Sequence, residues 1–519
     1  MQTMANRSRT ITTPIYYVNG RPHIGHVYTT TICDVWARFQ RLLGEDVFFL
    51  TGTDEHGQKV EQSAVERGMS PKALADENAA EFQKIMAQFG LSNDAFIRTT
   101  DPAHERQVQA FVQRLLDSGD VYLGTFEGWY DAGQEEYYTE TKARDCNYTS
   151  PVSGQPLEKA AQENFYFRLS AFQDRIESLF AEHPGFVRPD ARRNEILGRL
   201  REGLQDVPIS RTNFTWGIPV PGHPEHVIYV WIDALFNYIT ALGLGEGDPA
   251  ADGRDKYWPA TYHVIGKEIL WFHAVIWPAL LMALDLPRPD CIYAHSFWIS
   301  DGQKMSKSLG NFVDLERLQA SIDMYGLDAL RWYLTTSGPL GATDADFTAS
   351  QFHEVYTTDL VNTLGNCASR VSAMINKYCD GALPSDIDGP IGNIDLRACC
   401  EEASTSTIAA MSNFQLAAGC TEAMSIIRRV DAFINETEPF KMAKDPDQTA
   451  MLGGILYRCA ESIRIASALL TCVMPGTMAQ LHEAWSIDAQ GDLPTQCRWG
   501  GLQNGQVIIK VALFPRIES

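Results

Sequence analysis

The stretch TITTPIYYVNGRPHIGHVYTTTICDVWARFQRLL, residues 10–43, contains the two sequence patterns that decide the fold of this chain. Residues 10–18 are mostly apolar, β-branched or aromatic, which predicts a buried β-strand. After the turn VNGRP, apolar residues recur at three-to-four spacing from Ile24 to Leu43, which predicts an amphipathic helix. A buried strand that leads directly into such a helix is the building unit of a parallel α/β sheet.

The same alternation of strand and helix continues along the chain. Strands are predicted at VFFLTG (47–52), YHVIG (262–266) and CIYAHSFWI (291–299). A helix is predicted to begin at Ser70-Pro71, where serine caps it and proline enters its first turn, and to end at Gly90. This order predicts an α/β fold with a Rossmann-type, doubly wound parallel sheet.

Two further segments of the chain differ from this pattern in composition and in the spacing of their apolar residues. Residues 118–225 are rich in Tyr, Glu, Gly and Pro with short strand-like runs, which indicates an inserted connective domain. After residue 345, apolar stripes at helical spacing predict a C-terminal α-helical bundle. The expected division is a first half of the sheet domain at 1–117, the insertion at 118–225, the second half at 226–299, a lysine-containing loop region at 300–345 and the helical domain at 346–519.

Composition limits the class of protein. The 519 residues carry 43 basic and 65 acidic side chains, and the formal charge of −22 argues against indiscriminate binding of polyanions. That balance does not exclude a nucleic acid held by local basic patches. Eleven cysteines without a CxxC pair fit buried thiols in a reducing compartment, so we expect a cytoplasmic protein.

No segment predicts export or a membrane span. The N-terminal MQTMANRSRT lacks the apolar region of a secretory signal. The apolar run 269–286 is broken by His273 and Pro278. We therefore expect that run to be a buried core helix and expect no membrane partner.

The segment PHIGH, residues 22–26, places two imidazoles at the start of the helix that follows the first predicted strand. A helix N-terminus favours phosphate, Gly25 leaves backbone room for a ligand, and His23 and His26 can add hydrogen bonds. Taken alone, the pattern is equally consistent with a structural turn. A metal site is the weaker interpretation, because no third ligand follows at a suitable spacing.

The segment KMSKS, residues 304–308, places Lys304 and Lys307 on a loop flanked by glycines. Two ammonium groups on such a loop can neutralise phosphate charge as it develops in a reaction. By itself the pentapeptide favours an ordinary solvated loop. PHIGH and KMSKS in this order, each after a predicted strand, instead favour a shared nucleotide triphosphate site.

With these motifs the chain resembles the class I aminoacyl-tRNA synthetases, and among them the methionyl-tRNA synthetase family. That resemblance implies ATP-dependent ligation of methionine to tRNA(Met), initiator and elongator, through methionyl-adenylate, with ATP as a substrate and Mg²⁺ beside it. It covers nearly the whole chain and is carried by TTPIYYVNGRPHIGH (12–26), FLTGTDEHGQKV (49–60), YVWIDAL (229–235), HVIGKEILWFHAVIWPA (263–279), DGQKMSKSLGN (301–311), DLVNTLGNCASRV (359–371) and LFPRIES (513–519).

The resemblance implies a methionine pocket with apolar and aromatic walls, which suit an unbranched thioether. Asp54 is expected to hold the substrate ammonium, and Tyr17 and His273 are each expected to offer a polar contact to sulfur. Leu235 stands where many members have proline. For any single wall residue, ordinary core packing is the alternative. The expected lining is Ile15, Tyr17, Trp231, Ala234, Leu235, Tyr238, Ile269 and His273.

The resemblance also implies a reaction without a nucleophilic side chain. The methionine carboxylate attacks the α-phosphate of ATP, pyrophosphate leaves, and the terminal ribose 2′-OH of the tRNA then attacks the adenylate. The enzyme supplies positioning and charge stabilisation. The expected catalytic residues are His23, His26, Lys304 and Lys307. The expected ATP-binding residues are His23, Gly25, His26, Gly266, Lys267, Glu268, Lys304 and Lys307.

In the helical region, Asn362, Asn366 and Arg370 follow one another at i, i+4 and i+8. Spacing alone favours a solvated helix face. The resemblance implies that Asn366 and Arg370 meet the CAU anticodon. Phe440 stands where the family often has tryptophan, and we expect it to stack on a base with less surface.

The insertion departs from the family pattern. Many relatives bind zinc there with two cysteine pairs, but here Asp131 and Gln134 stand at the first pair, and only Cys146 remains of the second. One thiol cannot complete a four-ligand structural site. We therefore expect no zinc and an insertion held by packing. The chain also stops without the extra tRNA-binding domain of some dimeric relatives, so we expect a monomer.

Two other functions stay open at this point. One is another class I synthetase; the valine and leucine enzymes have a larger editing insertion, and the cysteine enzyme needs zinc. The other is a synthetase-like RNA-binding protein without catalysis. The intact His23, His26, Lys304 and Lys307 count against it.

Overall fold

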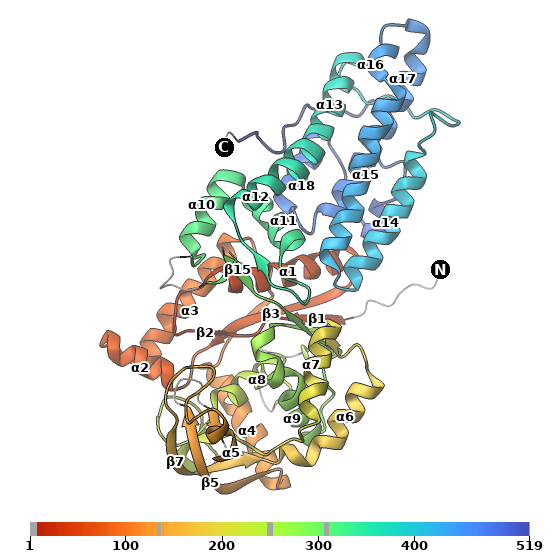
Figure 1. Cartoon of the computed structure of the whole chain (residues 1–519). Coiled ribbons are helices and arrows are strands. Elements are labelled where there is room, and N and C mark those ends of the chain that lie inside the picture. The colour runs from red at the N-terminus through yellow and green to blue at the C-terminus, as the bar shows by residue number, and fades with distance from the viewer. Residues whose placement is uncertain are drawn as a thin grey trace.

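A parallel sheet crosses the middle of the molecule, with helices on both of its faces (Figure 1). The computed structural model describes residues 8–131, 136–138, 140–245, 253–300, 302–305 and 311–517. Neighbouring strands follow the order β3, β1, β13, β14, β8, and β2 and β4 also pair with β3. Their bounds are β1 Ser8–Thr12, β2 Tyr16–Tyr17, β3 Asp46–Asp54, β4 Ala95–Arg98, β8 Val187–Arg188, β13 Tyr262–Gly266 and β14 Cys291–His295.

Side chains that alternate along the strands build two separate cores. Val47 and Phe49 of β3 pack in the core that contains α1 (Ile24–Leu42) and the C-terminal helices. Phe48 and Leu50 point to the opposite face, into the core of α4 (Pro102–Ser118), α8 (Val230–Thr240) and α9 (Trp277–Ala283). Strands buried on both faces by helices confirm the predicted doubly wound α/β fold.

Two segments that were each predicted as one continuous strand are divided in the structure. Pro14 lacks an N–H for the ladder, so the predicted strand 10–18 divides into β1 and β2. The predicted strand 291–299 also divides, into β14 and β15 (Trp298–Ser300). β15 belongs to a small separate sheet with β16 (Gln303–Lys304) and β17 (Ala345–Asp346).

The helix predicted to begin at Ser70-Pro71 is confirmed as α3 (Pro71–Gln88), whose Ala73 N–H donates to Ser70 Oγ over 3.2 Å. The apolar run 269–286 lies in the core as predicted, but it is not one regular helix. Phe272–Ile276 is π-helical, and α9 follows with Pro278 in its first turn. Within the described part of the chain, no helix has the length and apolarity that a membrane crossing requires.

Residues 118–225 form mainly antiparallel structure, with the order β6, β5, β7, β9 in one sheet and β10, β12, β11 in another. β8 lies in this range of the sequence but pairs with β14 of the parallel sheet. The bounds are β5 Val121–Asp131, β6 Glu136–Tyr138, α5 Glu140–Asp145, β7 Glu158–Phe167, α6 Gln173–Glu182, α7 Asp190–Leu200, β9 Val207–Pro208, β10 Ser210–Arg211, β11 Pro219–Val220 and β12 His223–Ile228.

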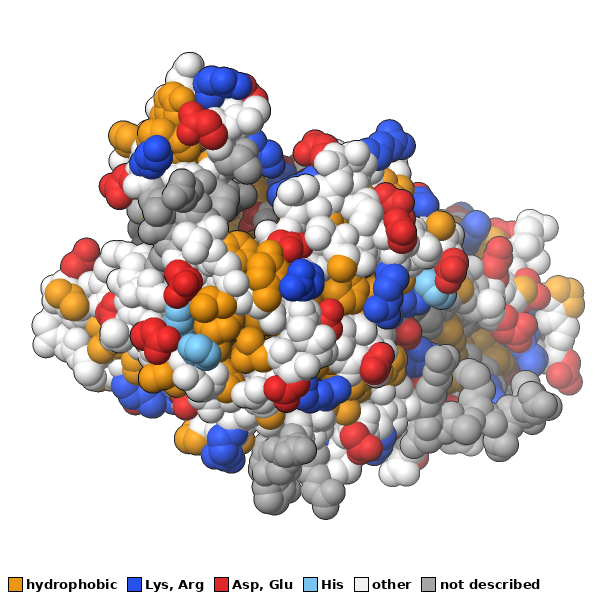
Figure 2. Space-filling view, turned by 90° about the horizontal axis from the view of Figure 1, so that it is seen from below, with side chains coloured by type: hydrophobic (Ala, Val, Ile, Leu, Met, Phe, Trp, Pro, Cys, Tyr) orange, Lys and Arg blue, Asp and Glu red, His pale blue; other side chains and the backbone are white. Residues whose placement is uncertain are grey.

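The chain beyond the parallel sheet is helical and forms the upper part of Figure 1. On the face seen from below in Figure 2, acidic and basic side chains are interspersed around apolar ones. The remaining bounds are α2 Gln58–Arg67, α10 Leu315–Tyr325, α11 Leu327–Ser337, α12 Ala349–Val355, α13 Asn366–Tyr378, α14 Leu396–Ser412, α15 Leu416–Thr437, α16 Pro439–Met442, α17 Thr449–Leu470, α18 Pro475–Ala484 and α19 Leu493–Gln496.

Candidate active site

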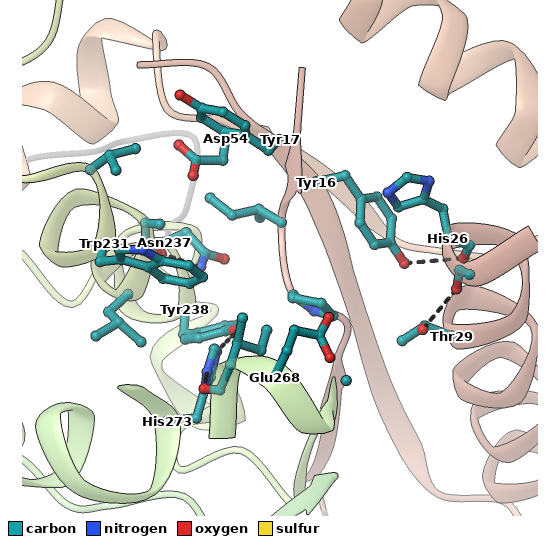
Figure 3. A pocket seen from close by; sticks show the side chains of 18 of the residues that line it. Tyr16, Tyr17, His26, Thr29, Asp54, Trp231, Asn237, Tyr238, Glu268 and His273 are labelled. Atoms are coloured by element: carbon teal, nitrogen blue, oxygen red, sulfur yellow. Dashed lines mark hydrogen bonds between the residues drawn. The ribbon is translucent and has the colours of Figure 1, made fainter. Parts of the chain in front are cut away.

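A cavity of about 370 Å³ opens at the carboxyl ends of the parallel strands, beside the first turn of α1 (Figure 3). This edge is where doubly wound sheets bind ligands. Segments far apart in the sequence meet there. Among the residues that line the cavity are Ile15, Tyr17, His23, Gly25, His26, Asp54, Trp231, Ala234, Leu235, Tyr238, Gly266, Glu268, Ile269 and His273.

The two predicted histidines begin α1 with a reciprocal cap. His23 Nδ1 accepts from the Gly25 N–H over 3.1 Å, and His26 Nδ1 accepts from the His23 N–H over 3.1 Å. Their ring centroids lie 3.9 Å apart. Because each Nδ1 accepts, the neutral tautomer of either ring carries its proton on Nε2. Both rings are therefore oriented as Nε2–H donors, which suits phosphate oxygens.

His26 is held in a neutral form by its surroundings. Burial, and then the neighbouring His23, lower the pKa of His26 well below its usual value. Tyr16 and Phe82 both meet its ring edge-on, at centroid distances of 4.7 Å and 5.2 Å. The ring can donate a hydrogen bond here, but it adds no positive charge.

At the deep end of the cavity, Tyr238 and His273 form a hydrogen bond whose donor and acceptor can be assigned. His273 Nδ1 lies 3.0 Å from the Ile269 carbonyl, which can only accept, so Nδ1 carries the proton. Nε2 therefore accepts from the Tyr238 hydroxyl over 2.8 Å (Figure 3). Burial lowers the pKa of His273 to about 4, so this neutral form persists at neutral pH. Both ring nitrogens of His273 thus have partners in this structure, Nδ1 the Ile269 carbonyl and Nε2 the Tyr238 hydroxyl, and its polar contact to sulfur stays a prediction.

Two carboxylates line the cavity. Asp54 ends β3, and Glu268 follows β13. Burial raises the pKa of Glu268, and the positive charges of Lys267 and Lys304 partly offset this rise. A Cβ on Gly266 would lie 2.4 Å from the Glu268 carboxylate, so any larger residue there would displace that carboxylate.

The lysine loop is anchored at both ends beside α1. Before it, Lys304 of β16 pairs with Ile299. After it, the Ile24 N–H donates to the Val313 carbonyl over 3.2 Å, and the Phe312 ring lies 5.2 Å from that of His23. The two motifs are thus neighbours in space.

Among the described residues, two of the predicted ATP residues, Lys267 and Lys304, do not line the cavity. Lys267 Nζ instead pairs with Asp344 over 2.6 Å and lies over the Phe297 ring. The positive charge of Lys304 lowers the pKa of Glu268, which does line the cavity. Lys307 lies outside the described residues, so its predicted role stays a prediction.

The cavity has further lining residues that the sequence did not indicate. Asn237 is the clearest: its side chain is 1% exposed, its Nδ2 donates to the Ala234 carbonyl, and its Oδ1 makes no hydrogen bond within the described residues. Its position one residue before Tyr238 was the available signal. The others are Pro14, Tyr16, Thr29, Lys59, Val230, His295 and Phe297.

The predicted anticodon residues lie among the C-terminal helices. Asn366 is exposed at the start of α13. Arg370 reaches α15, where Asp431 lies 3.9 Å and Asn435 3.4 Å from its guanidinium. Phe440 on α16 is 41% exposed. An exposed aromatic ring suits base stacking, and these three roles stay predictions.

The insertion contains a hydrogen-bonded cluster near the expected metal positions. Trp129 Nε1 and the Tyr148 hydroxyl both donate to Glu140, over 2.7 Å and 2.9 Å. Asp131 is buried and accepts from Ser153 Oγ over 2.9 Å.

Of the zinc-position residues, the Cys146 thiol donates to a backbone carbonyl 3.3 Å away, and Gln134 falls outside the described residues. No group of three or more His, Cys, Asp or Glu side chains that could hold a metal ion occurs among the residues described. The absence of zinc stays a prediction.

Comparisons with known proteins agree with this geometry. The family model of class I tRNA synthetases (M) matches residues 9–151 and 146–372. The methionine–tRNA ligases of Halalkalibacterium halodurans and Bacillus subtilis are each 42% identical to the chain, which covers 78% of the length of each; the matches include 98% and 99% of the chain.

Solved structures lead to the same family. A Mycobacterium tuberculosis methionyl-tRNA synthetase in complex with methionyl-adenylate is 33% identical, with a TM-score of 0.89 over 98% of this chain and 100% of that one. Its apo form is 30% identical, with a TM-score of 0.85 over 99% of both chains. The fold, the cavity and these relatives together confirm that the chain belongs to the methionyl-tRNA synthetase family, the class I enzymes that ligate methionine to tRNA.

Proposed function

We propose that the protein charges tRNA(Met), initiator and elongator alike, in two steps that pass through methionyl-adenylate. The observation that carries this proposal is one cavity in which an apolar, aromatic-walled pocket adjoins the PHIGH helix start, which is in turn in contact with Phe312 and Val313 after the lysine loop. One end suits a thioether side chain, and the other suits phosphates.

In the first step, a methionine carboxylate oxygen attacks the α-phosphorus of MgATP. A carboxylate–phosphorus bond forms, the bond to the bridging oxygen breaks, and MgPPi leaves. Asp54 holds the substrate ammonium, and the Nε2–H groups of His23 and His26 donate to phosphate oxygens. Lys304 and Lys307 neutralise the departing charge, with Gly25, Gly266, Lys267 and Glu268 around the nucleotide.

In the second step, the 2′-OH of the tRNA 3′-terminal ribose attacks the adenylate carbonyl, and AMP leaves. We propose that Asn366, Arg370 and Phe440 read the CAU anticodon at the far end of the molecule. Exposed polar groups and an aromatic face are the means by which proteins read unpaired bases.

We also propose that the protein acts in the cytoplasm as a monomer, with the domain division at 1–117, 118–225, 226–299, 300–345 and 346–519. The change from parallel sheet to antiparallel insertion to helices supports that division. Size-exclusion chromatography with light scattering tests the oligomeric state. One mass near 57.9 kDa supports the monomer, and twice that mass contradicts it.

The proposed activity is tested by ATP–pyrophosphate exchange with each of the twenty amino acids in turn, followed by charging of tRNA transcripts. Methionine-dependent exchange and charging of both tRNA(Met) species are expected. Exchange with another amino acid would make the protein a different synthetase. No exchange with any amino acid would make it a non-catalytic RNA-binding protein.

A further inference from the structure

A buried network of histidine and aspartate lies directly behind the methionine end of the cavity. Asp233 of α8 is 0% exposed, and each of its carboxylate oxygens has one imidazole partner at 2.7 Å. His56 Nδ1 meets Oδ2, and His104 Nε2, from α4, meets Oδ1. His104 Nδ1 in turn lies 2.7 Å from Thr240 Oγ1, at the last turn of α8. Within the reaction assigned above, none of these four side chains has a role.

The network fixes the rotation of α8 about its own axis. Successive residues of an α-helix are about 100° apart around the axis, which places four cavity residues of α8 about 100–160° from Asp233. They are Trp231, Ala234, Leu235 and Tyr238, whereas the other two cavity residues of α8, Val230 and Asn237, lie about 40–60° from Asp233. A carboxylate bonded on one side of the helix therefore sets where the pocket wall on the other side points.

The same network joins α8 to the turn that carries Asp54. His56 follows Asp54 by two residues, and the turn closes at Gly57 with φ of +103°. A Cβ at Gly57 would lie 3.0 Å from the Tyr17 hydroxyl and 3.5 Å from Val230, so the turn is packed against both walls of the cavity. The predicted ammonium site and the predicted side-chain walls are thus connected through His56.

The His56–Asp233 contact is charge-assisted. Burial by itself lowers the pKa of His56, but Asp233, with contributions from Glu105 and Asp54, raises it to about 10. Asp233 is completely buried, and the two histidines hold its pKa below the ordinary value despite that burial. Such a bond is stronger and more directional than one between neutral groups.

We propose that His56 and His104 are positioning residues for the methionine subsite, which act through Asp233 to fix the pocket face of α8 against the Asp54 turn. This inference rests on the proposed function, because it concerns how that same cavity binds methionine. Neither histidine touches substrate. Their effect is expected on methionine binding rather than on ATP binding, because α8 and the Asp54 turn form only the methionine end.

The test uses the full chain and measures KM for methionine and for ATP separately in ATP–pyrophosphate exchange. His56→Ala removes the donor to Asp233 and is expected to raise KM for methionine by about 10-fold or more, with KM for ATP changed by less than about 2-fold. His56→Asn is expected to restore KM for methionine to within about 3-fold, because the amide N–H replaces Nδ1–H. His104→Gln, whose amide replaces Nε2–H, is expected to rescue relative to His104→Ala in the same way.

Controls separate positioning from general stability. His226→Ala removes a buried histidine of β12 that is bonded to Ser210 and does not line the cavity, and it is expected to leave both KM values unchanged. If His56→Ala does not fold, His56→Gln replaces it, since its longer amide moves the donor away from Asp233.

Equal increases in both KM values, or a His56→Asn enzyme no better than His56→Ala, would overturn the positioning role. Absence of methionine-dependent exchange in the unaltered enzyme would instead overturn the proposed function itself.

Discussion

The two ends of the cavity, to which we assign methionine and the phosphates, are built in different ways. At the methionine end, polar side chains are tied to one another by buried hydrogen bonds, as Tyr238 is to His273 and Asp233 is to His56. At the phosphate end, the start of α1 supplies the polar groups, and the lysines that we propose to act there come from the neighbouring loop. Selection of a small ligand needs fixed walls, whereas departure of a phosphate needs charge placed for the transition state.

The largest effect that this comparison predicts is at the phosphate end. Lys307→Ala is expected to slow adenylate formation by about 10²–10³-fold, because one cation that stabilises the departing pyrophosphate is lost. Binding of methionine is expected to change by less than about 2-fold, since the opposite end of the cavity is untouched. Single-turnover kinetics and equilibrium methionine binding measure the two quantities.

A matched control for that variant is Lys256→Ala, which removes an exposed lysine paired with Asp46, outside the cavity. It is expected to leave both quantities unchanged. Equal losses of rate and methionine affinity in Lys307→Ala would show that the loop does not act on the departing phosphates.

At the methionine end, Asp54→Asn is expected to raise KM for methionine by about 10–100-fold, because a charge-assisted bond to the ammonium becomes a neutral one. KM for ATP is expected to stay within about 3-fold. Steady-state exchange kinetics measure both constants. An unchanged KM for methionine would remove Asp54 from the site and leave the ammonium to another group.

The buried charges at the methionine end also predict a pH dependence of stability. The pKa of His56 in the folded protein is about 10, against an ordinary 6.5, so protonated His56 stabilises the fold fully below pH 6.5 and loses that contribution as pH rises through 10. The difference in Tm between the unaltered protein and His56→Asn is therefore expected to be several degrees at pH 6.5 and to shrink toward pH 10.

Thermal unfolding at a series of pH values measures that difference. A Tm difference that stays constant over this range would mean that His56 is neutral in the fold. The methionine end would then hold no buried cation, and a buried charge would not distinguish it from the phosphate end.

The smallest effect is expected in the insertion, which lies outside both ends of the cavity. Trp129 and Tyr148 each donate a hydrogen bond to Glu140, and one thiol, Cys146, remains at the expected metal positions. Dialysis against a strong chelator is therefore expected to leave Tm and activity unchanged, and metal analysis is expected to find no stoichiometric zinc. One zinc per chain that is lost together with stability would contradict this prediction.

Much of the site could be predicted because local sequence determines it. The PHIGH cap needs only residues 23–26, and β13 coincides with the predicted 262–266. Pro14 divided a predicted strand, although its missing N–H was visible in the sequence, and the helix predicted over 269–286 includes a π-helical segment before Pro278.

Other features could not be predicted, because they depend on partners distant in the chain. The positions of the protons on Tyr238 and His273 depend on the Ile269 backbone carbonyl, and Asn237 enters the cavity only through the placement of α8. His56 lies 177 residues from Asp233, so no spacing pattern connects them.

By itself, then, the sequence determined the alternation of strand and helix, the reactive motifs and the family they imply, because periodicity and short-range capping act within a few residues. Only the tertiary structure decided which side chains share a cavity, which imidazoles are neutral and which is charged. Those properties follow from burial and from charges brought close by the fold, and neither exists in an extended chain.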